Sequence, residues 1–303
     1  MRLASLRLDG RVVGAVVEDD TAYPLPDGHS VGGLVQLGLE HALEVGATAR
    51  GGSGVPLDPA TLELPYRPAS VRDFVTFESH VEGVRRSVDS ASGVPDAWYD
   101  APTFYFTNPH ALYGPGAAIP RPVTCRALDF ELEVGVVLGR GGTSLTESEA
   151  ADVIFGYTIV NDWSARDLQS REMQVGLGPA KGKDFATSIG PWIVTADELP
   201  SLDLDCRVSV NGEHVGGDRL SNMHWTFVEM IAYASRDSVV LPGDLLASGT
   251  TGGGGCLAEL WGRRGEQTPP PLEPGDVVRM DVEGIGTLTG TVAEGHPAEG
   301  RST

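Results

Sequence analysis

Short apolar runs separated by polar turns make up most of the chain after about residue 70. DFELEVGVVLG (129–139), IFGYTIVND (154–162) and PWIVTAD (191–197) each have the length of one buried strand. Asn211–Gly212 separates two alternating segments and predicts a hairpin, and two Pro-Gly-Asp turns precede further runs. SNMHWTFVEMIAYASRD (221–237) is the clearest helix, with a serine cap. The pattern predicts a mainly β, mixed α+β main domain with mostly antiparallel strands.

The beginning of the chain predicts a small α+β domain of its own. Strand-like runs flank an Asp9–Gly10 turn, and apolar residues recur at helical spacing over 31–49. The stretch 53–68 is rich in proline and has the composition of a connection between domains. We therefore predict two domains, 1–65 and 66–303.

The charge of the chain limits the kinds of partner that it can bind. A formal net charge of −20 argues against nucleic acid and anionic membranes as partners, because both repel such a surface. No segment approaches the roughly 18 apolar residues of a membrane span, and the N-terminal residues lack the apolar run of a signal peptide. The three cysteines are widely spaced and form no metal-binding motif. We expect a cytoplasmic enzyme with reduced thiols.

Two glutamates stand out in the apolar segment 129–139. Glu131 and Glu133 are two residues apart, so in a strand they share one face, opposite Phe130 and Leu132. Two buried carboxylates this close need a cation, and a hard divalent ion such as Mg²⁺ or Ca²⁺ prefers oxygen ligands. The alternative is an edge strand with a solvated polar face, and this stretch alone leaves both interpretations open.

Further charged residues follow other predicted strands. Asp162 ends the apolar run 154–162, and Asp73 lies at the end of another apolar patch. Lys181 and Lys183 lie in a glycine-rich loop further along. Strand ends and the loops after them commonly carry reactive side chains, so these residues are candidates for the same site.

Three segments in succession carry a family resemblance. DFELEVGVVLGRGG, IFGYTIVNDWSARDLQ and GPAKGKDFATSIGPWIV together resemble the core of the fumarylacetoacetate hydrolase superfamily, from about residue 70 to 295. The resemblance implies a β-sandwich roll as the main domain, a small N-terminal domain and a homodimer. It also implies a divalent metal, which we expect to be Mg²⁺, with Ca²⁺ or Mn²⁺ as alternatives.

The resemblance assigns roles by position. It implies four metal ligands: Asp73, Glu131, Glu133 and Asp162. It places a catalytic base at His80, which keeps its spacing from Asp73, with Glu259 as the partner that orients the histidine. It places Lys183 in catalysis and Lys183 and Thr187 beside the metal. The residues that would contact substrate are Tyr105, Gln169, Thr250 and Arg85.

These roles describe a hydrolase that cleaves a C–C bond in a β-diketo or acylpyruvate-type acid. Water would be activated by His80 and Glu259, and the enolate stabilised by the metal and Lys183. A decarboxylase, isomerase or lyase acting on a 2-oxo acid through the same site is the alternative reading. A non-catalytic, ligand-binding descendant is a third.

The residues around the substrate depart from the family pattern. Val75 stands where the name-giving enzyme has a tyrosine, and Met173 lies near the expected place of another. An arginine of that enzyme has no clear counterpart, although Arg85 and Arg86 are near enough to replace it. We interpret GGGG (252–255) as a flexible lid loop. The substrate is therefore expected to differ from fumarylacetoacetate.

Overall fold

The structure is a computed structural model that describes residues 1–88 and 92–295. Its larger sheet holds twelve strands: β1 (Arg2–Leu8), β2 (Arg11–Glu18), β3 (Thr21–Pro24), β4 (Val55–Pro56), β5 (Leu62–Glu63), β6 (Val71–Phe74), β7 (Phe104–Phe106), β8 (Leu112–Tyr113), β11 (Leu132–Leu138), β13 (Ile154–Asp162), β15 (Thr187–Thr195) and β19 (Leu245–Ala247). Ten of them follow the order β4-β3-β2-β1-β15-β13-β11-β19-β6-β7, while β5 pairs with β1 and β8 with β15.

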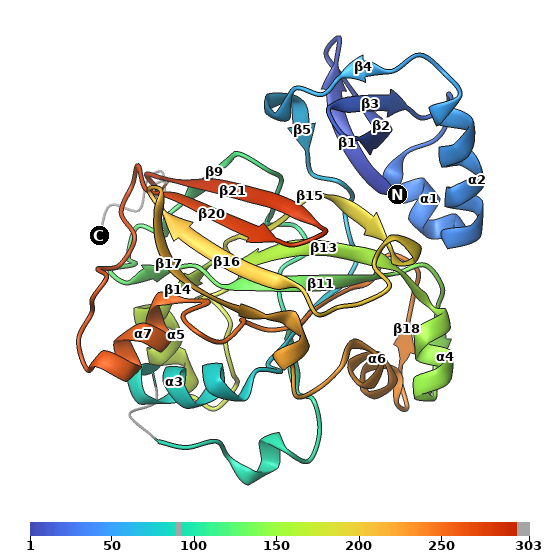
Figure 1. The fold of residues 1–303 in the computed structure, drawn as a ribbon. Helices are drawn as coiled ribbons and strands as arrows, with labels where there is room; N and C mark the ends of the chain where they lie inside the picture. Colours follow the sequence, from blue (N-terminus) through green and yellow to red (C-terminus); the bar gives the residue numbers. More distant parts are fainter. Residues whose placement is uncertain (89–91, 296–303) are drawn as a thin grey trace, which may run out of the picture.

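A second sheet of five strands packs beside the first (Figure 1). Its order is β17 (Glu213–Arg219), β16 (Asp205–Val210), β20 (Val277–Val282), β21 (Gly286–Ala293) and β9 (Ala117–Pro120). Two small sheets pair β10 (Leu128–Asp129) with β14 (Ser164–Ala165), and β12 (Gly142–Thr143) with β18 (Val239–Val240). Most pairings are antiparallel, so the predicted mixed α+β, mostly strand fold is confirmed.

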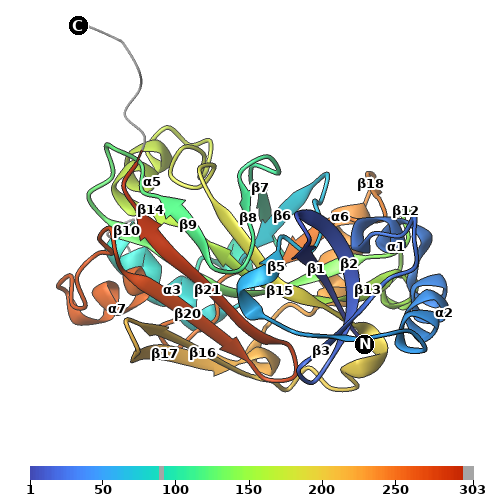
Figure 2. The same ribbon diagram turned by 90° about the horizontal axis from the view of Figure 1, so that it is seen from above.

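The helices lie around these sheets. Figures 1 and 2 show α1 and α2 beside the N-terminal strands, and α3, α5 and α7 together at another end of the molecule. The bounds are α1 (Val31–Leu37), α2 (Leu39–Arg50), α3 (Glu78–Val88), α4 (Glu147–Asp152), α5 (Arg166–Met173), α6 (Phe227–Ser235) and α7 (Leu257–Arg264). Short 3₁₀ turns are η1 (Pro59–Thr61), η2 (Asp96–Trp98), η3 (Ala196–Glu198) and η4 (Leu220–Asn222). Within residues 1–88 and 92–295, none of the helices is long and apolar enough to cross a membrane.

Alternation along β11 builds the core between the two sheets. Phe130, Leu132 and Val134 are fully buried in the largest apolar cluster, together with Met280 and Leu288 of the second sheet. Because side chains alternate across a strand, the opposite face of β11 is left for other contacts. This face carries the two glutamates, as the sequence predicted.

The turns that the sequence predicted are present. Asp9–Gly10 joins β1 to β2, and Asn211–Gly212 joins β16 to β17. The Pro-Gly-Asp turns precede β19 and β20. At both hairpin turns the residues have positive φ, which Asn, Asp and Gly tolerate better than other residues.

Two predicted helices were wrong in their bounds. The periodic stretch 31–49 is two helices, because Gly38 has a φ of +90° and ends α1 before α2 begins. The helix predicted over 221–237 spans only α6 and is capped by Thr226, not by a serine. Thr226 and Glu229 form a reciprocal capping box. Their side chains accept hydrogen bonds from backbone N–H groups at the start of the helix, so the helix begins directly after Thr226.

The N-terminal segment is joined to the main sheet. β1 pairs with β15, and Met1 and Leu3 share an apolar cluster with Phe155 and Ile189. Residues 1–65 therefore extend the large sheet at one edge. The domain boundary at residue 65 stays a prediction.

Candidate metal centre and active site

Neighbouring strands of the large sheet bring the candidate ligands to one edge. Thr187 at the start of β15 pairs with Asp162 at the end of β13, and Asp73 of β6 pairs with Tyr105 of β7. Between these pairs run β11, which carries Glu133, and β19. Side chains from segments far apart in the sequence therefore meet at one place, because the strand order is set by tertiary pairing.

Four carboxylates gather there around one ammonium group. Carboxylate oxygens of Asp73, Glu131 and Glu133 lie within 4.8 Å of one another. The Nζ atom of Lys183 is 2.5 Å from Glu131 Oε2 and 2.6 Å from Asp162 Oδ2. All four acids and Lys183 are at most 5% exposed. The structure thus brings together five of the six residues that the sequence placed in and beside the metal site.

Tyr105 connects two of these acids. Its hydroxyl is 2.9 Å from Asp73 Oδ2 and also contacts Asp162 Oδ2. Burial, followed by the nearby charge of Asp162, raises the pKa of Tyr105 well above its usual value, so the hydroxyl keeps its proton. The hydroxyl has one proton, so it donates to one carboxylate at a time while it lies within hydrogen-bond distance of both. Through these contacts Tyr105 links Asp73 of β6 to Asp162 of β13, which its predicted role beside substrate did not include.

Burial and mutual repulsion set the charge of the acids. The pKa values of Asp73 and Glu133 are raised well above their usual range, first by burial and then by neighbouring carboxylates. Burial also acts on Glu131, but Lys183 and Arg166 outweigh it and lower its pKa to about 2. Burial opposes the charge of Lys183, but the adjacent carboxylates prevail and raise its pKa.

The centre has the properties of a cation site. With all four carboxylates ionised, their charge would exceed that of Lys183 by three, and Arg166 offsets this only in part because it also pairs with Asp129. The raised pKa values of Asp73 and Glu133 express the cost of this excess when no cation is bound. Among the described residues, Glu133 Oε2 and Asp162 Oδ1 are buried without a hydrogen-bond partner. A buried carboxylate oxygen without a partner is costly unless a cation meets it. The residues present, all oxygen donors, fit a hard divalent ion.

A histidine and a glutamate lie next to this centre on two packed helices. His80 of α3 and Glu259 of α7 are both buried, and His80 Nδ1 is 3.7 Å from Glu259 Oε2. That distance exceeds a hydrogen bond, although catalytic contacts commonly shorten when substrate binds. Arg263 of α7 reaches back to Glu259 Oε1 at 2.5 Å. Glu259 thus lies between a histidine and a basic side chain.

Two glycines allow the helices to approach. A Cβ atom on Gly83 of α3 would overlap the Glu259 side chain, and one on Gly262 of α7 would overlap the Gly83 carbonyl. The spacing of His80 from Glu259 therefore depends on small residues one turn away along each helix. This requirement comes from tertiary packing, and the sequence alone did not reveal it.

Sequence reasoning missed Arg166 and Asp129 as members of the site. Arg166 Nη2 is 2.7 Å from Asp129 Oδ2 and 2.8 Å from Glu131 Oε1. Asp129 also accepts hydrogen bonds from the backbone N–H groups of Leu257 and Ala258 at the start of α7. Both residues stand inside the quoted family segments, and an acid beside an apolar strand was the signal available. They connect Glu131 to the helix that carries Glu259.

The remaining predicted site residues differ in what they contact. Thr250 Oγ1 is 3.5 Å from Glu133 Oε1. Thr187, predicted beside the metal, is buried, and its Oγ1 atom lies 3.4 Å from Thr107 Oγ1. Gln169 accepts a hydrogen bond from Arg166 at 3.0 Å, so it borders the centre through that arginine. Arg85 instead donates to the carbonyls of residues 92 and 93. Its predicted contact with substrate therefore requires a change of side-chain position.

The glycine run 252–255 differs from the lid that the sequence suggested. Gly255 accepts a hydrogen bond from Leu132 N at 2.9 Å, and Gly253 accepts one from Gly217 N at 3.2 Å. The loop is thereby fixed to β11 and β17, and three of its four glycines are buried. The interpretation as a lid was wrong, because close packing against strands, which glycine permits, explains the composition.

Known proteins are similar to this chain in sequence. A family model described as fumarylacetoacetate (FAA) hydrolase C-terminal matches residues 69–293. An uncharacterized protein of Pyrococcus horikoshii is 35% identical over 191 residues, which are 62% of this chain and 76% of that protein. A protein of Mycobacterium tuberculosis is 37% identical over 193 residues, which are 63% of this chain and 66% of that protein.

Solved structures of named enzymes share the fold. A fumarylacetoacetate hydrolase of Exiguobacterium antarcticum has a TM-score of 0.74 and 26% identity, over 97% of this chain and 99% of that one. A maleylpyruvate hydrolase of Sphingobium, in complex with manganese(II) and pyruvate, has a TM-score of 0.72 and 25% identity, over 98% and 100%. A 5-carboxymethyl-2-hydroxymuconate delta-isomerase of Mycobacterium smegmatis has a TM-score of 0.71 and 27% identity, over 97% and 100%.

The neighbours include hydrolases and an isomerase, and one of the hydrolases holds manganese(II). The match over most of the chain, the sheet order and the acidic centre agree with one another. The chain therefore belongs to the fumarylacetoacetate hydrolase family.

Proposed function

We propose that this protein is a divalent-metal-dependent hydrolase that cleaves a C–C bond in a β-diketo or acylpyruvate-type acid. The observation that carries the proposal is a buried histidine–glutamate pair beside four buried carboxylates and a buried lysine. Cleavage by water needs a base, whereas decarboxylation does not. The pairing of His80 with Glu259 therefore favours hydrolysis over decarboxylation.

The metal would be held by four acids: Asp73, Glu131, Glu133 and Asp162. When bound, a divalent ion would orient a 1,3-dicarbonyl acid and polarise one of its carbonyl groups. Mg²⁺ is our first choice, with Mn²⁺ or Ca²⁺ as alternatives, since the ligands are all oxygen atoms. Thr187 and Thr250 border the same acids and offer hydroxyl groups to the substrate.

His80 is the proposed general base. It takes a proton from water while the water oxygen forms a bond to the substrate carbonyl carbon. The C–C bond next to that carbon then breaks, and its electron pair passes to the adjoining carbon as an enolate. His80 returns the proton to this carbon, so that two acids leave and the base is restored. Glu259, facing Nδ1, holds the imidazole orientation and stabilises its charged form.

Lys183 supplies a fixed positive charge. Its raised pKa keeps the ammonium charged, and it is buried where few waters screen it. A preorganised cation of this kind stabilises negative charge on the substrate oxygens during the reaction. Tyr105 and Gln169 are further candidates for substrate contact, and Arg85 would need to turn toward the site. The homodimer and the cytoplasmic location stay predictions.

An isomerase acting on an unsaturated 2-oxo acid is the second candidate. The similarity to the M. smegmatis isomerase, at 27% identity over 97% of this chain, supports it. Proton transfer between two carbons of such an acid could use the same base. The difference lies in the product, since isomerisation keeps the carbon skeleton and hydrolysis divides it.

A product-resolved assay separates the two. The protein, loaded with Mg²⁺, Mn²⁺ or Ca²⁺, is incubated with acylpyruvates, oxaloacetate and ring-derived diketo acids, and the products are identified by mass spectrometry. The proposal expects two acids from an acylpyruvate, with incorporation of one oxygen from ¹⁸O-labelled water. An isomer of unchanged mass, or loss of CO₂ alone, would replace hydrolysis with one of the other reactions.

A further inference from the structure

Cys256 lies in the active-site region without a part in the proposed reaction. Its Sγ atom is 3.8 Å from His80 Nδ1, and both side chains are buried. Ligand atoms of His80, Glu131 and Cys256 all lie within 4.8 Å of one another. Three different elements bring these groups together: α3, the segment before β11 and the residue that caps α7.

This set of donors differs from the acidic centre in its chemistry. Imidazole nitrogen, thiolate sulfur and carboxylate oxygen are the ligands that Zn²⁺ takes in proteins, at about 2.0–2.3 Å. A tetrahedral ion at such distances separates its nitrogen and sulfur ligands by about 3.6 Å. The observed 3.8 Å between His80 Nδ1 and Cys256 Sγ is close to this value. Oxygen-only centres, in contrast, suit Mg²⁺ or Ca²⁺.

A second observation points to a cation at this place. Glu259 Oε2 is buried and, within the described part of the chain, has no hydrogen-bond partner. Glu259 Oε1 pairs with Arg263 Nη2 at 2.5 Å, whereas Oε2 faces His80 Nδ1 at 3.7 Å. A cation bound to His80 Nδ1 would lie near Glu259 Oε2 and stabilise its negative charge.

Other roles account poorly for the thiol. Cys256 caps α7 by accepting from Glu259 N at 3.4 Å, but serine is the better residue for that task. Burial, followed by the charge of Asp129, raises the pKa of the Cys256 thiol well above its usual value. A thiol that keeps its proton is a poor nucleophile in the metal-free protein, and a metal ion must displace this proton in order to bind the sulfur.

We propose that His80, Glu131 and Cys256 form a second metal site, selective for a borderline-soft ion such as Zn²⁺, which shares Glu131 with the acidic centre. Binding forms a metal–sulfur bond and releases the thiol proton to solvent, with no change of oxidation state. The ion binds His80 Nδ1, so the neutral imidazole carries its one proton on the other ring nitrogen and cannot take a proton from water while the site is filled. This inhibitory consequence rests on the proposed function, whereas the binding itself does not.

A surface hollow gives cations a place to gather nearby. It has a volume of about 610 Å³ and is lined by residues next to the site, including Ser79 and Gly253. Three acids, Glu78, Glu82 and Asp218, line it as well, together with one arginine, Arg263. Acids in a concave surface raise the local concentration of cations. Ser79 directly precedes His80, so this hollow lies on the outer side of the histidine helix.

Cobalt spectroscopy tests the binding without any assay of activity. The protein is titrated with an excess of Co²⁺ in the presence of Mg²⁺, and the near-ultraviolet absorption is recorded. Sulfur-to-cobalt charge transfer is expected in the native protein, since oxygen ligands alone do not produce it. The band should be lost in Cys256→Ser, which keeps a capping side chain for α7, and persist in Cys125→Ser, whose thiol is also buried.

Absence of the band in the native protein, or its persistence in Cys256→Ser, would overturn the proposal. Should Cys256→Ser fold poorly, anomalous diffraction from native crystals soaked in Zn²⁺ and Mg²⁺ decides instead. The proposal expects zinc bonded to Cys256 Sγ. Zinc confined to the acidic centre refutes it.

Inhibition is measured separately, with each variant compared with its own rate in Mg²⁺. Losing one ligand should raise the Zn²⁺ concentration for half-inhibition more than about tenfold in Cys256→Ser, because even partners behind the ligands change metal affinity this much. Equal inhibition of native protein and Cys256→Ser would refute the inhibitory role. A protein that lacks hydrolase activity but shows the cobalt band would contradict the proposed function and leave the metal site intact.

Discussion

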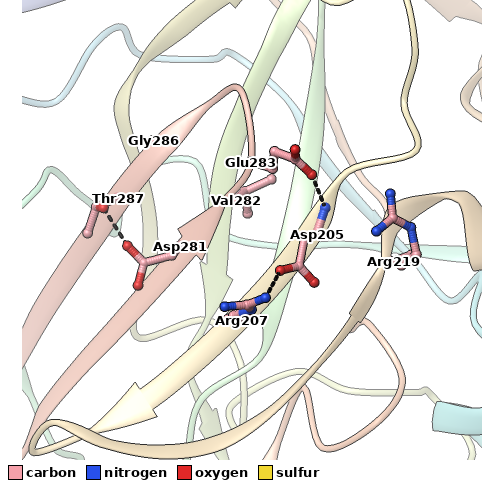
Figure 3. Close-up of a pocket in the computed structure, with 8 residues that line it drawn as sticks. All are labelled: Asp205, Arg207, Arg219, Asp281, Val282, Glu283, Gly286 and Thr287. Atoms are coloured by element: carbon pink, nitrogen blue, oxygen red, sulfur yellow. Dashed lines mark hydrogen bonds and ion pairs between the residues drawn. The ribbon is translucent and has the colours of Figure 1, made fainter.

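The acidic centre and the hollow on the second sheet both combine carboxylates with basic side chains. They differ in how far the negative charges are compensated. The hollow, of about 510 Å³, lies along β16, β17, β20 and β21 (Figure 3). In it Arg207 is 2.5 Å from Asp205, and Thr287 donates to Asp281 at 2.6 Å. In the acidic centre four carboxylates share Lys183 and part of Arg166.

Burial explains the difference. Arg207 is 66% exposed, so water screens its pair and the contact is worth little. The acids of the centre are at most 5% exposed, so each uncompensated charge there is costly. A charged hollow that is easy to see on the surface is therefore a weaker indication of function than a closed cluster whose charges do not balance.

The largest expected effect is the loss of a centre carboxylate. Asp162→Ala removes a ligand and one attachment of Lys183. We expect metal binding to be lost and the rate to fall by more than about a thousandfold, since a bound ion supplies several kcal/mol of charge stabilisation. Isothermal titration with Mn²⁺ and the hydrolysis assay measure both. Asp281→Asn in the hollow is the matched control and should bind metal as the native protein does.

His80→Ala should separate binding from chemistry. The metal remains bound because the four acids are intact, while hydrolysis falls about 10²–10⁴-fold without a general base. The same titration and the product-resolved assay are compared for this variant and the native protein. A near-normal rate of C–C cleavage would contradict the role of His80 as the general base.

The thermal stability of the protein should depend on both pH and bound metal, because the carboxylates of the acidic centre repel one another. The raised pKa values of Asp73 and Glu133 mean that the folded protein holds protons which the unfolded chain releases. Their stabilising contribution to the free energy of unfolding is therefore full below about pH 4, where the groups titrate in the unfolded chain. It is lost as the pH rises through the higher pKa values of the folded protein. Mg²⁺ at about a hundred times its dissociation constant should add about 2.7 kcal/mol to the free energy of unfolding.

Calorimetric melting from pH 5 to 8, with and without Mg²⁺, measures this effect. Glu133→Gln should reduce the pH dependence of the metal-free protein because the amide does not titrate. A pH dependence that is the same in Glu133→Gln and the native protein would place its origin elsewhere, such as in the net charge of −20.

The smallest effect is expected in the hollow. Arg207→Ala removes an exposed ion pair on β16, and the free energy of unfolding should change by no more than about 0.5 kcal/mol. The rate and the affinity for Mn²⁺ should stay as in the native protein. A loss of activity comparable to that of Asp162→Ala would show that the comparison between the two regions is mistaken.

Much of the local structure could be predicted because its causes are local. The Asp9–Gly10 and Asn211–Gly212 turns follow from residues that tolerate positive φ, and the alternation from Phe130 to Val134 fixes which side chains face the core. The helix bounds were less accurate. Gly38 and Thr226 end and begin helices through single backbone and capping contacts that periodicity does not register.

The sequence by itself determined that Glu131 and Glu133 share one face of a strand, since side chains alternate with a period of two residues. Their family segments also indicated the chemistry. Tertiary structure decided which other groups meet them. The order of β15, β13, β11, β19 and β6 places Asp162 and Asp73 beside them, and the close packing of α3 on α7 brings His80 to Glu259 and Cys256. These contacts join residues up to 179 positions apart, and no local rule of backbone geometry specifies such distances.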